Sequence, residues 1–247
     1  MPSQAASMHD ERQLATSDLR WWHFTKQSAA LELAESLAPE WKAQVWSLEL
    51  DQCKGKRSYI VASIEAFWRR YRGLHPPARH YYELIRAGRP CHLYFDLEFC
   101  RAANPGSTRC GEQMVRTLCM EVRHALGARF GTKHSADCRI VDLDSSTPQK
   151  FSRHIIIRMR DAAFSSNVHV GSFVHELLSS FLARRANEPP IAAMFVAPPT
   201  SRAPSAAAQV SFVDTSVYSR NRCFRLCNAA WPFRLSTHSC SLSLLHA

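Results

Sequence analysis

The chain has 247 residues, 46% hydrophobic and 21% charged, which is typical of a globular protein. No run approaches the roughly 18 apolar residues of a membrane-spanning helix, and nine cysteines without paired spacing argue against a disulfide framework and for an intracellular protein. Lysine and arginine outnumber acidic residues by 31 to 21. The resulting charge of +10 favours a polyanionic partner such as nucleic acid or a nucleotide, with solubility alone as the alternative.

Apolar periodicity predicts helices at 28–37, 63–72, 112–130 and 172–185, and strands at 44–50, 57–64, 80–85, 92–99, 151–159 and 209–218. Ser63 stands where a helix N-cap is expected. Residues 189–208 are rich in Pro, Ala and Ser and are predicted to form a disordered linker that buries no core. The pattern as a whole predicts an α+β fold with one open sheet face.

The strand at 92–99 places two carboxylates on one face. Successive strand side chains point to opposite faces, so Asp96 and Glu98 share a side, roughly 7 Å apart, while Leu97 faces the core. A solvated acidic edge is the ordinary interpretation of such a pair. The alternative is a divalent-metal site, because such ions prefer hard oxygen ligands.

Later segments add cations and a third carboxylate. In one strand Ser152 and His154 share a face, and Lys150 precedes them as a cation that could meet a phosphate. Asp214 ends a later apolar run. Arginines then cluster at 220–225, where guanidinium groups suit bidentate phosphate contacts, although a basic exposed strand is the alternative.

Together these groups match nucleotidyl transfer. Three carboxylates can hold two divalent ions that flank a triphosphate and activate an attacking 3′-oxygen. Lysine, histidine and arginine side chains would neutralise the phosphates while charge develops in the transition state.

The strings LYFDLEF, KFSRHIII and FVDTSVYSRNRCFRL, in this order, resemble three motifs of the eukaryotic primase-polymerase (PrimPol) family, within the archaeo-eukaryotic primase superfamily. The resemblance implies a small N-terminal α/β module and an RRM-like catalytic module, incomplete at the C-terminus. It implies that Asp96, Glu98 and Asp214 are catalytic and bind Mn²⁺ or Mg²⁺. It implies that the incoming dNTP or NTP is contacted by Lys150, Ser152, His154, Arg222, Arg225 and Tyr82, and that Arg57 contacts the template.

The implied activity is that of a DNA primase and DNA-directed DNA polymerase acting on single-stranded DNA and a primer strand. Its implied role is repriming and damage tolerance at stalled forks, in the nucleus, the mitochondrion or both. The implied division is a flexible N-terminus at 1–18, an α/β module at 19–88, a catalytic module at 89–188 and 209–228, the linker at 189–208 and a divergent tail at 229–247.

The resemblance ends after Cys227. The family's C-terminal zinc module and partner-binding tail are therefore expected to be absent, as in a truncated form, and no zinc is expected because the remaining Cys and His residues fit no common finger spacing. Two other functions stay open: a fragment that binds DNA or nucleotide without turnover, and a metal-dependent nuclease. The Ser-x-His strand and the distal arginines favour nucleotidyl transfer over the nuclease, because they suit a triphosphate better than a water nucleophile.

Overall fold

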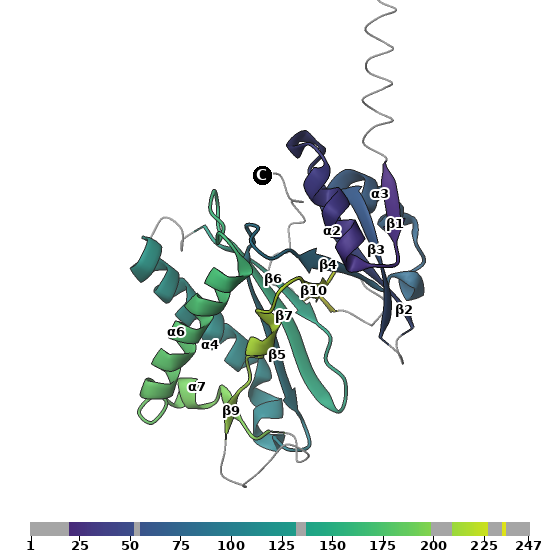
Figure 1. The fold of residues 1–247 in the computed structure, drawn as a ribbon. Helices are drawn as coiled ribbons and strands as arrows, with labels where there is room; N and C mark the ends of the chain where they lie inside the picture. Colours follow the sequence, from purple (N-terminus) through teal and green to yellow (C-terminus); the bar gives the residue numbers. More distant parts are fainter. Residues whose placement is uncertain (1–19, 52–54, 132–136, 199–208, 227–233, 236–247) are drawn as a thin grey trace, which may run out of the picture. The chain divides into compact units, whose positions relative to one another are not determined.

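A computed structural model describes residues 20–51, 55–131, 137–198, 209–226 and 234–235 (Figure 1). The fold is α+β, as the sequence predicts, and the paired strands of its sheets are antiparallel. The chain divides into two compact units, the first formed mainly by residues up to Arg86 and the second mainly by residues from Ala87 to Arg222. No described helix is long and apolar enough to cross a membrane.

The first unit contains a five-stranded sheet of order β1-β3-β2-β4-β10. Its strands are β1 (Trp21–Phe24), β2 (Ala43–Asp51), β3 (Lys56–Ser63), β4 (Tyr81–Ile85) and β10 (Arg222–Arg225). The helical segments are α2 (Gln27–Ser36), α3 (Ile64–Gly73) and two short 3-10 turns, η1 (Pro39–Trp41) and η2 (Pro76–Ala78).

Each face of this first sheet is covered by one helix, because neighbouring residues of β2 point to opposite sides. Phe67 of α3 stacks on Trp46, with ring centroids 3.7 Å apart, and Ala30 of α2 packs in a second cluster with Val45. The predicted N-cap of α3 is confirmed, since Ser63 Oγ accepts a hydrogen bond from the Ala66 amide.

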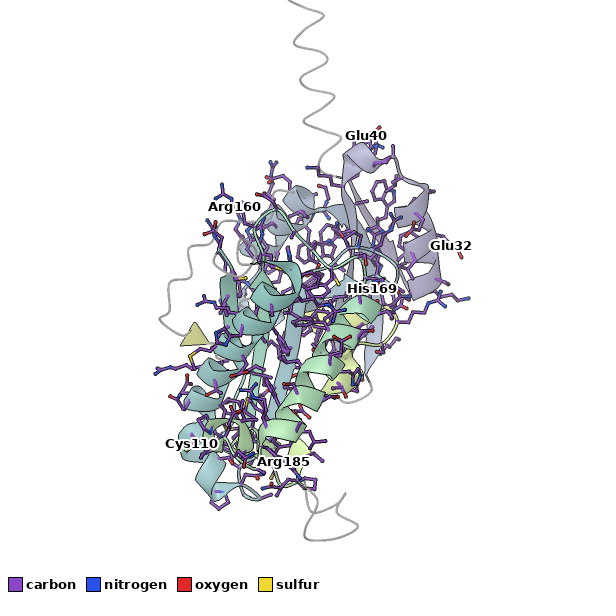
Figure 2. All side chains as sticks on the ribbon, turned by 90° about the vertical axis from the view of Figure 1, so that its left-hand side faces the viewer. Glu32, Glu40, Cys110, Arg160, His169 and Arg185 are labelled. Carbon is purple, nitrogen blue, oxygen red and sulfur yellow. The ribbon has the colours of Figure 1, made fainter. Side chains whose placement is uncertain are left out.

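The second unit contains a four-stranded sheet of order β11-β6-β7-β5. Its strands are β5 (Leu93–Cys100), β6 (Arg139–Asp144), β7 (Lys150–Arg158) and β11 (Arg234–Leu235). Helices α4 (Pro105–Phe130) and α6 (Asn167–Arg184) lie side by side in front of the strands in Figure 2, where His169 marks the start of α6 and Arg185 its end. The unit also holds α7 (Pro189–Ala192), the strand pair β8 (Phe195–Val196) and β9 (Val210–Ser211), and the 3-10 turn η4 (Thr215–Val217).

Strand β7 alternates between buried and more exposed side chains along its length. Arg153 belongs to the buried series, and its side chain is only 2% exposed. Its buried charge is compensated by ion pairs with carboxylates. Its guanidinium lies 2.7 Å from Asp142 Oδ2 and 3.5 Å from Asp144 Oδ1, both on β6, and also contacts Glu112 of α4. The opposite, half-exposed face of β7 carries the predicted site residues.

The predicted disordered linker is wrong over 189–198. Here α7 and β8 form, and Ile191, Met194 and Val196 are buried, because these spaced apolar side chains pack into the second unit despite the Pro- and Ala-rich composition. The remaining linker residues 199–208 lie outside the described part of the chain, as do the N-terminus at 1–18 and the tail at 229–247 apart from β11.

Two other elements differ from expectation. The helix expected at 112–130 begins at Pro105, where a proline suits the first helical turn. The strand expected at 209–218 is only two residues long and is followed by η4. Residues 223–226, expected in the catalytic module, belong to the first unit because β10 is a neighbour of β4 in its sheet.

Candidate active site

The two polar strands of the second unit pair so that their site residues stand opposite one another. In the antiparallel ladder of β5 and β7, Asp96 is the partner of His154 and Glu98 is the partner of Ser152. Directly opposed residues on one sheet face have neighbouring side chains. His154 Nε2 accordingly lies 3.5 Å from Asp96 Oδ1, and Lys150 Nζ contacts Glu98 Oε2.

Asp214 reaches the same strand through the backbone. Its amide donates to the Asp96 carbonyl oxygen at 2.8 Å, and Val213 forms an isolated bridge with Leu97. The Asp214 carboxylate accepts hydrogen bonds from the Ser216 amide and from Ser216 Oγ, both at 2.9 Å. The three carboxylates predicted from distant parts of the sequence are therefore brought together at one place on β5.

Burial and repulsion shape the charge of this group. The pKa of Asp96 is raised from 3.8 to about 6, chiefly by burial and then by the nearby carboxylates of Glu98 and Asp214, against the opposing effect of Lys150 and Arg222. Asp96 Oδ1 is buried and accepts no hydrogen bond from the described residues. A buried carboxylate held next to two others favours a cation that would share their oxygens.

The arrangement bears on the expected metal in two ways. Among the described residues, no group of three or more His, Cys, Asp or Glu side chains is placed so that it could hold a metal ion as it stands. Glu98 instead engages Lys150, and Asp214 engages Ser216. The ligand chemistry nevertheless fits Mn²⁺ or Mg²⁺, because the available groups are hard carboxylate oxygens and Asp96 Oδ1 accepts no hydrogen bond from the described residues. Glu98 would exchange Lys150 for the ion, whereas Asp214 can keep its bonds to Ser216, because a carboxylate has more lone pairs than these two bonds use.

Ser152, which is expected to contact the nucleotide, is hydrogen-bonded to two serines of the neighbouring loop. Ser145 Oγ donates to Ser152 Oγ at 3.0 Å, and the Ser152 amide donates to Ser146 Oγ at 3.0 Å. Arg222, at the start of β10, lies close enough to Asp96 to lower its pKa. These two residues thus belong to the same surroundings as the carboxylates.

The other three predicted residues form a separate cluster within the first unit. Tyr82 donates its hydroxyl to Glu49 Oε2 at 2.7 Å and accepts a hydrogen bond from Arg225 at 3.1 Å. The Arg57 guanidinium lies 4.7 Å from the centre of the Tyr82 ring and 3.9 Å from Glu49. Burial, reinforced by the hydrogen bond to Glu49, raises the pKa of Tyr82 to about 12, so the phenol stays protonated.

Sequence reasoning missed Glu49, which accepts from Tyr82 and pairs with Arg57. Its signal was weak, because one acidic residue near the end of a strand is ordinary. It also missed Tyr94 and Tyr218, whose hydrogen bonds go to backbone atoms and leave no pattern in the sequence.

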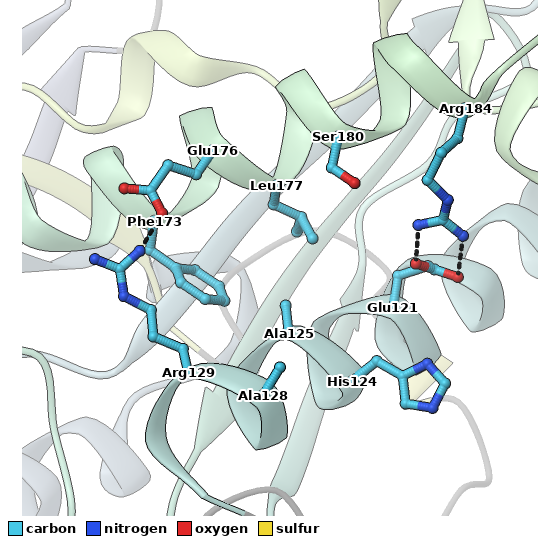
Figure 3. Close-up of a pocket in the computed structure, with 10 residues that line it drawn as sticks. All are labelled: Glu121, His124, Ala125, Ala128, Arg129, Phe173, Glu176, Leu177, Ser180 and Arg184. Atoms are coloured by element: carbon cyan, nitrogen blue, oxygen red, sulfur yellow. Dashed lines mark hydrogen bonds and ion pairs between the residues drawn. The ribbon is translucent and has the colours of Figure 1, made fainter.

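A groove of about 600 Å³ lies elsewhere in the second unit, between α4 and α6 (Figure 3). Phe173 lines it, and two ion pairs cross it, Arg129 with Glu176 and Arg184 with Glu121. None of the predicted site residues lines this groove, so it is distinct from the candidate active site.

No family model matches the chain. Among curated proteins, the chain is 38% identical over 162 residues to the DNA-directed primase/polymerase protein of Homo sapiens, a match covering 66% of this chain and 28% of the relative. The protein of the same name from Danio rerio is 33% identical over 230 residues, covering 83% of this chain and 42% of the relative. The chain therefore spans less than half the length of these relatives.

Proposed function

Because the chain belongs, over its matched residues, to the family of DNA-directed primase/polymerase proteins, we propose that it is a metal-dependent nucleotidyltransferase that synthesises DNA on a single-stranded template. Priming without a primer, and a role in repriming at stalled forks in the nucleus or mitochondrion, are the finer parts of this proposal. The RRM-like primase core is the fold that we propose for the second unit.

The observation that carries the proposal is the register of β5 against β7. It sets Asp96 opposite His154 and Glu98 opposite Ser152, while the backbone of Asp214 bonds to Asp96. A solvated acidic edge would not need a third carboxylate delivered from a segment more than 110 residues away in the sequence.

Each residue has a distinct part in the proposed reaction. Lys150 and Arg222 neutralise phosphate oxygens of the incoming nucleotide, because both are cations beside the carboxylate group. His154 and Ser152 donate hydrogen bonds to the same phosphates from the half-exposed face of β7. In the first unit, Arg225 and Tyr82 contact the nucleotide, and Arg57 contacts the template; we carry these three roles over from the family resemblance.

Asp96, Glu98 and Asp214 would hold divalent ions, which would supply charge neutralisation and a more acidic 3′-hydroxyl on the primer. The protein contributes the position of the three carboxylates. It also makes the ionised form of Asp96 unfavourable in the absence of a bound cation, through burial and the neighbouring carboxylates.

The test is primer extension by the full chain on single-stranded DNA, with Mn²⁺ or Mg²⁺ and dNTPs. We expect Asp96→Asn and Asp214→Asn to lose metal-dependent synthesis. The control Asp161→Asn removes an exposed acid at a left-handed backbone position that asparagine tolerates, and should extend like the parent chain. Near-parent rates in either site variant under matched metal would refute the assignment.

A second function, binding without turnover, is favoured by one observation: Glu98 and Asp214 are engaged by residues of their own chain. In that case the folded parent chain binds DNA or nucleotide, forms no product, and keeps its binding in Asp96→Asn. A parallel reaction without primer separates initiation from extension.

A further inference from the structure

Asp214 lies in a short segment with little regular structure of its own. The two-residue strand β9 ends at Ser211, and Asp214 then caps the single turn η4 through its bonds to Ser216. The side chain of Asp214 thus moves with η4, because its carboxylate is bonded to that turn. Whatever holds η4 against β5 therefore helps to place the third carboxylate, together with the bond from the Asp214 amide to the Asp96 carbonyl oxygen.

Two tyrosines hold η4 to β5 by reciprocal hydrogen bonds to backbone. Tyr94, on β5 and on the same face as Asp96, donates its hydroxyl to the carbonyl oxygen of Val217 at 3.1 Å. Tyr218 donates its hydroxyl back to the carbonyl oxygen of Tyr94 at 2.8 Å. The two rings are in contact, with centroids 5.2 Å apart. We call this pair the tyrosine clamp.

Helix α6 contacts the same segment. Asn167, in its first turn, is 1% exposed and donates through Nδ2 to the carbonyl oxygen of Ser219 at 2.8 Å. Gly171, one turn later, faces Tyr218 so closely that a Cβ at this position would stand 3.0 Å from the Tyr218 Cβ. The segment after Asp214 is thus fixed at Val217, Tyr218 and Ser219, from a strand and a helix.

We infer that Tyr94 and Tyr218 are positioning residues, which hold Asp214 beside Asp96 so that the two carboxylates can share a metal ion. This inference rests on the proposed function. The position of Tyr94 explains the arrangement: it stands two residues before Asp96, so the strand that supplies one carboxylate also anchors the turn that supplies another. Neither hydroxyl needs to touch the metal or the nucleotide.

The experiment uses Tyr218→Phe and Tyr94→Phe in the full chain, because each removes one hydroxyl and keeps the ring. Two readouts are combined: Mn²⁺ binding by calorimetry, and primer extension analysed for kcat and for the KM of the dNTP. We expect each variant to weaken Mn²⁺ binding and lower kcat by roughly fivefold to tenfold, the effect of losing one buried hydrogen bond, with the dNTP KM within about twofold of the parent. Hydrogen exchange of the Asp214 amide should become faster.

Two controls separate positioning from general stability. Tyr59→Phe removes a phenol hydroxyl from β3 in the first unit, and Glu121→Gln weakens the α4–α6 ion pair within the second unit. Both should bind Mn²⁺ like the parent. If Asp214→Asn loses Mn²⁺ binding but Tyr218→Phe and Tyr94→Phe match the parent in binding and kcat, the positioning role is overturned and the proposed function stands. If the parent chain binds no Mn²⁺ at all, both are overturned.

Discussion

Replacing Asp96 with asparagine should stabilise the metal-free protein while abolishing its metal-dependent activity. The folded chain raises the pKa of this carboxyl from 3.8 to about 6, mainly through burial and then through Glu98 and Asp214. A shift of roughly two units corresponds to about 3 kcal/mol of destabilisation by the ionised form. The side chain is only 15% exposed, so solvent screens little of this. Allowing about 1 kcal/mol for the buried amide of asparagine leaves a gain of about 2 kcal/mol.

The sign of the pH dependence follows from the raised pKa. The unfavourable contribution of Asp96 is absent below the unfolded pKa near 4 and complete above the folded pKa of about 6. The parent should therefore lose this part of its stability as the pH rises through that window. The Asp96→Asn variant should not, so its advantage at about pH 7.5 should largely vanish at about pH 4.

The assay must report on the second unit. The tryptophans in the described chain, at positions 21, 22, 41, 46 and 68, all belong to the first unit, so tryptophan fluorescence would follow the wrong part. Hydrogen exchange of the β5 and β7 amides measures the second unit directly. A metal-free variant that is less stable than the parent at about pH 7.5, or whose advantage does not depend on pH, would refute the reasoning.

Metal should reverse the order of stability. Mn²⁺ at about 100 times its dissociation constant stabilises a folded protein that binds it by about 2.7 kcal/mol. We expect this gain in the parent and not in Asp96→Asn. If Mn²⁺ stabilised both proteins by the same amount, the ion would bind at a site that does not include Asp96.

Arg225→Ala should chiefly raise the dNTP KM, because the residue is proposed to contact phosphate; an unchanged KM would count against that role. DNA binding should weaken steeply with salt, and Arg57→Gln should reduce the slope of log K against log salt by about 1 if this residue meets a template phosphate. A slope equal to that of the parent would show that Arg57 does not contact a template phosphate. Ser63→Ala should destabilise the first unit by about 1 kcal/mol, because the Ala66 amide loses its cap. Urea denaturation followed by tryptophan fluorescence tests this, and an unchanged midpoint would contradict it.

The carboxylate pair could be predicted from sequence because a period of two leaves Asp96 and Glu98 on the face opposite Leu97. The same alternation identified Ser152 and His154. The tyrosine clamp could not be predicted, since Tyr94 and Tyr218 are 124 positions apart and bind carbonyl groups that every residue has. The composition of residues 189–208, taken as a whole, wrongly predicted disorder for their first part. The Pro-rich average gave no weight to single apolar residues such as Ile191, which is buried.

Buried Arg153 has a consequence for how β7 can pair. A slip of one residue against β5 would turn every side chain of β7 to the other face, so His154 would point toward the helices and Arg153 outward. That alternative would leave Asp142, which is only 15% exposed, without its cation, and an uncompensated buried charge costs about 3 to 5 kcal/mol. The ion pairs of Arg153 thus disfavour the shifted register, in which the strand could still be compact but His154 would face away from the site.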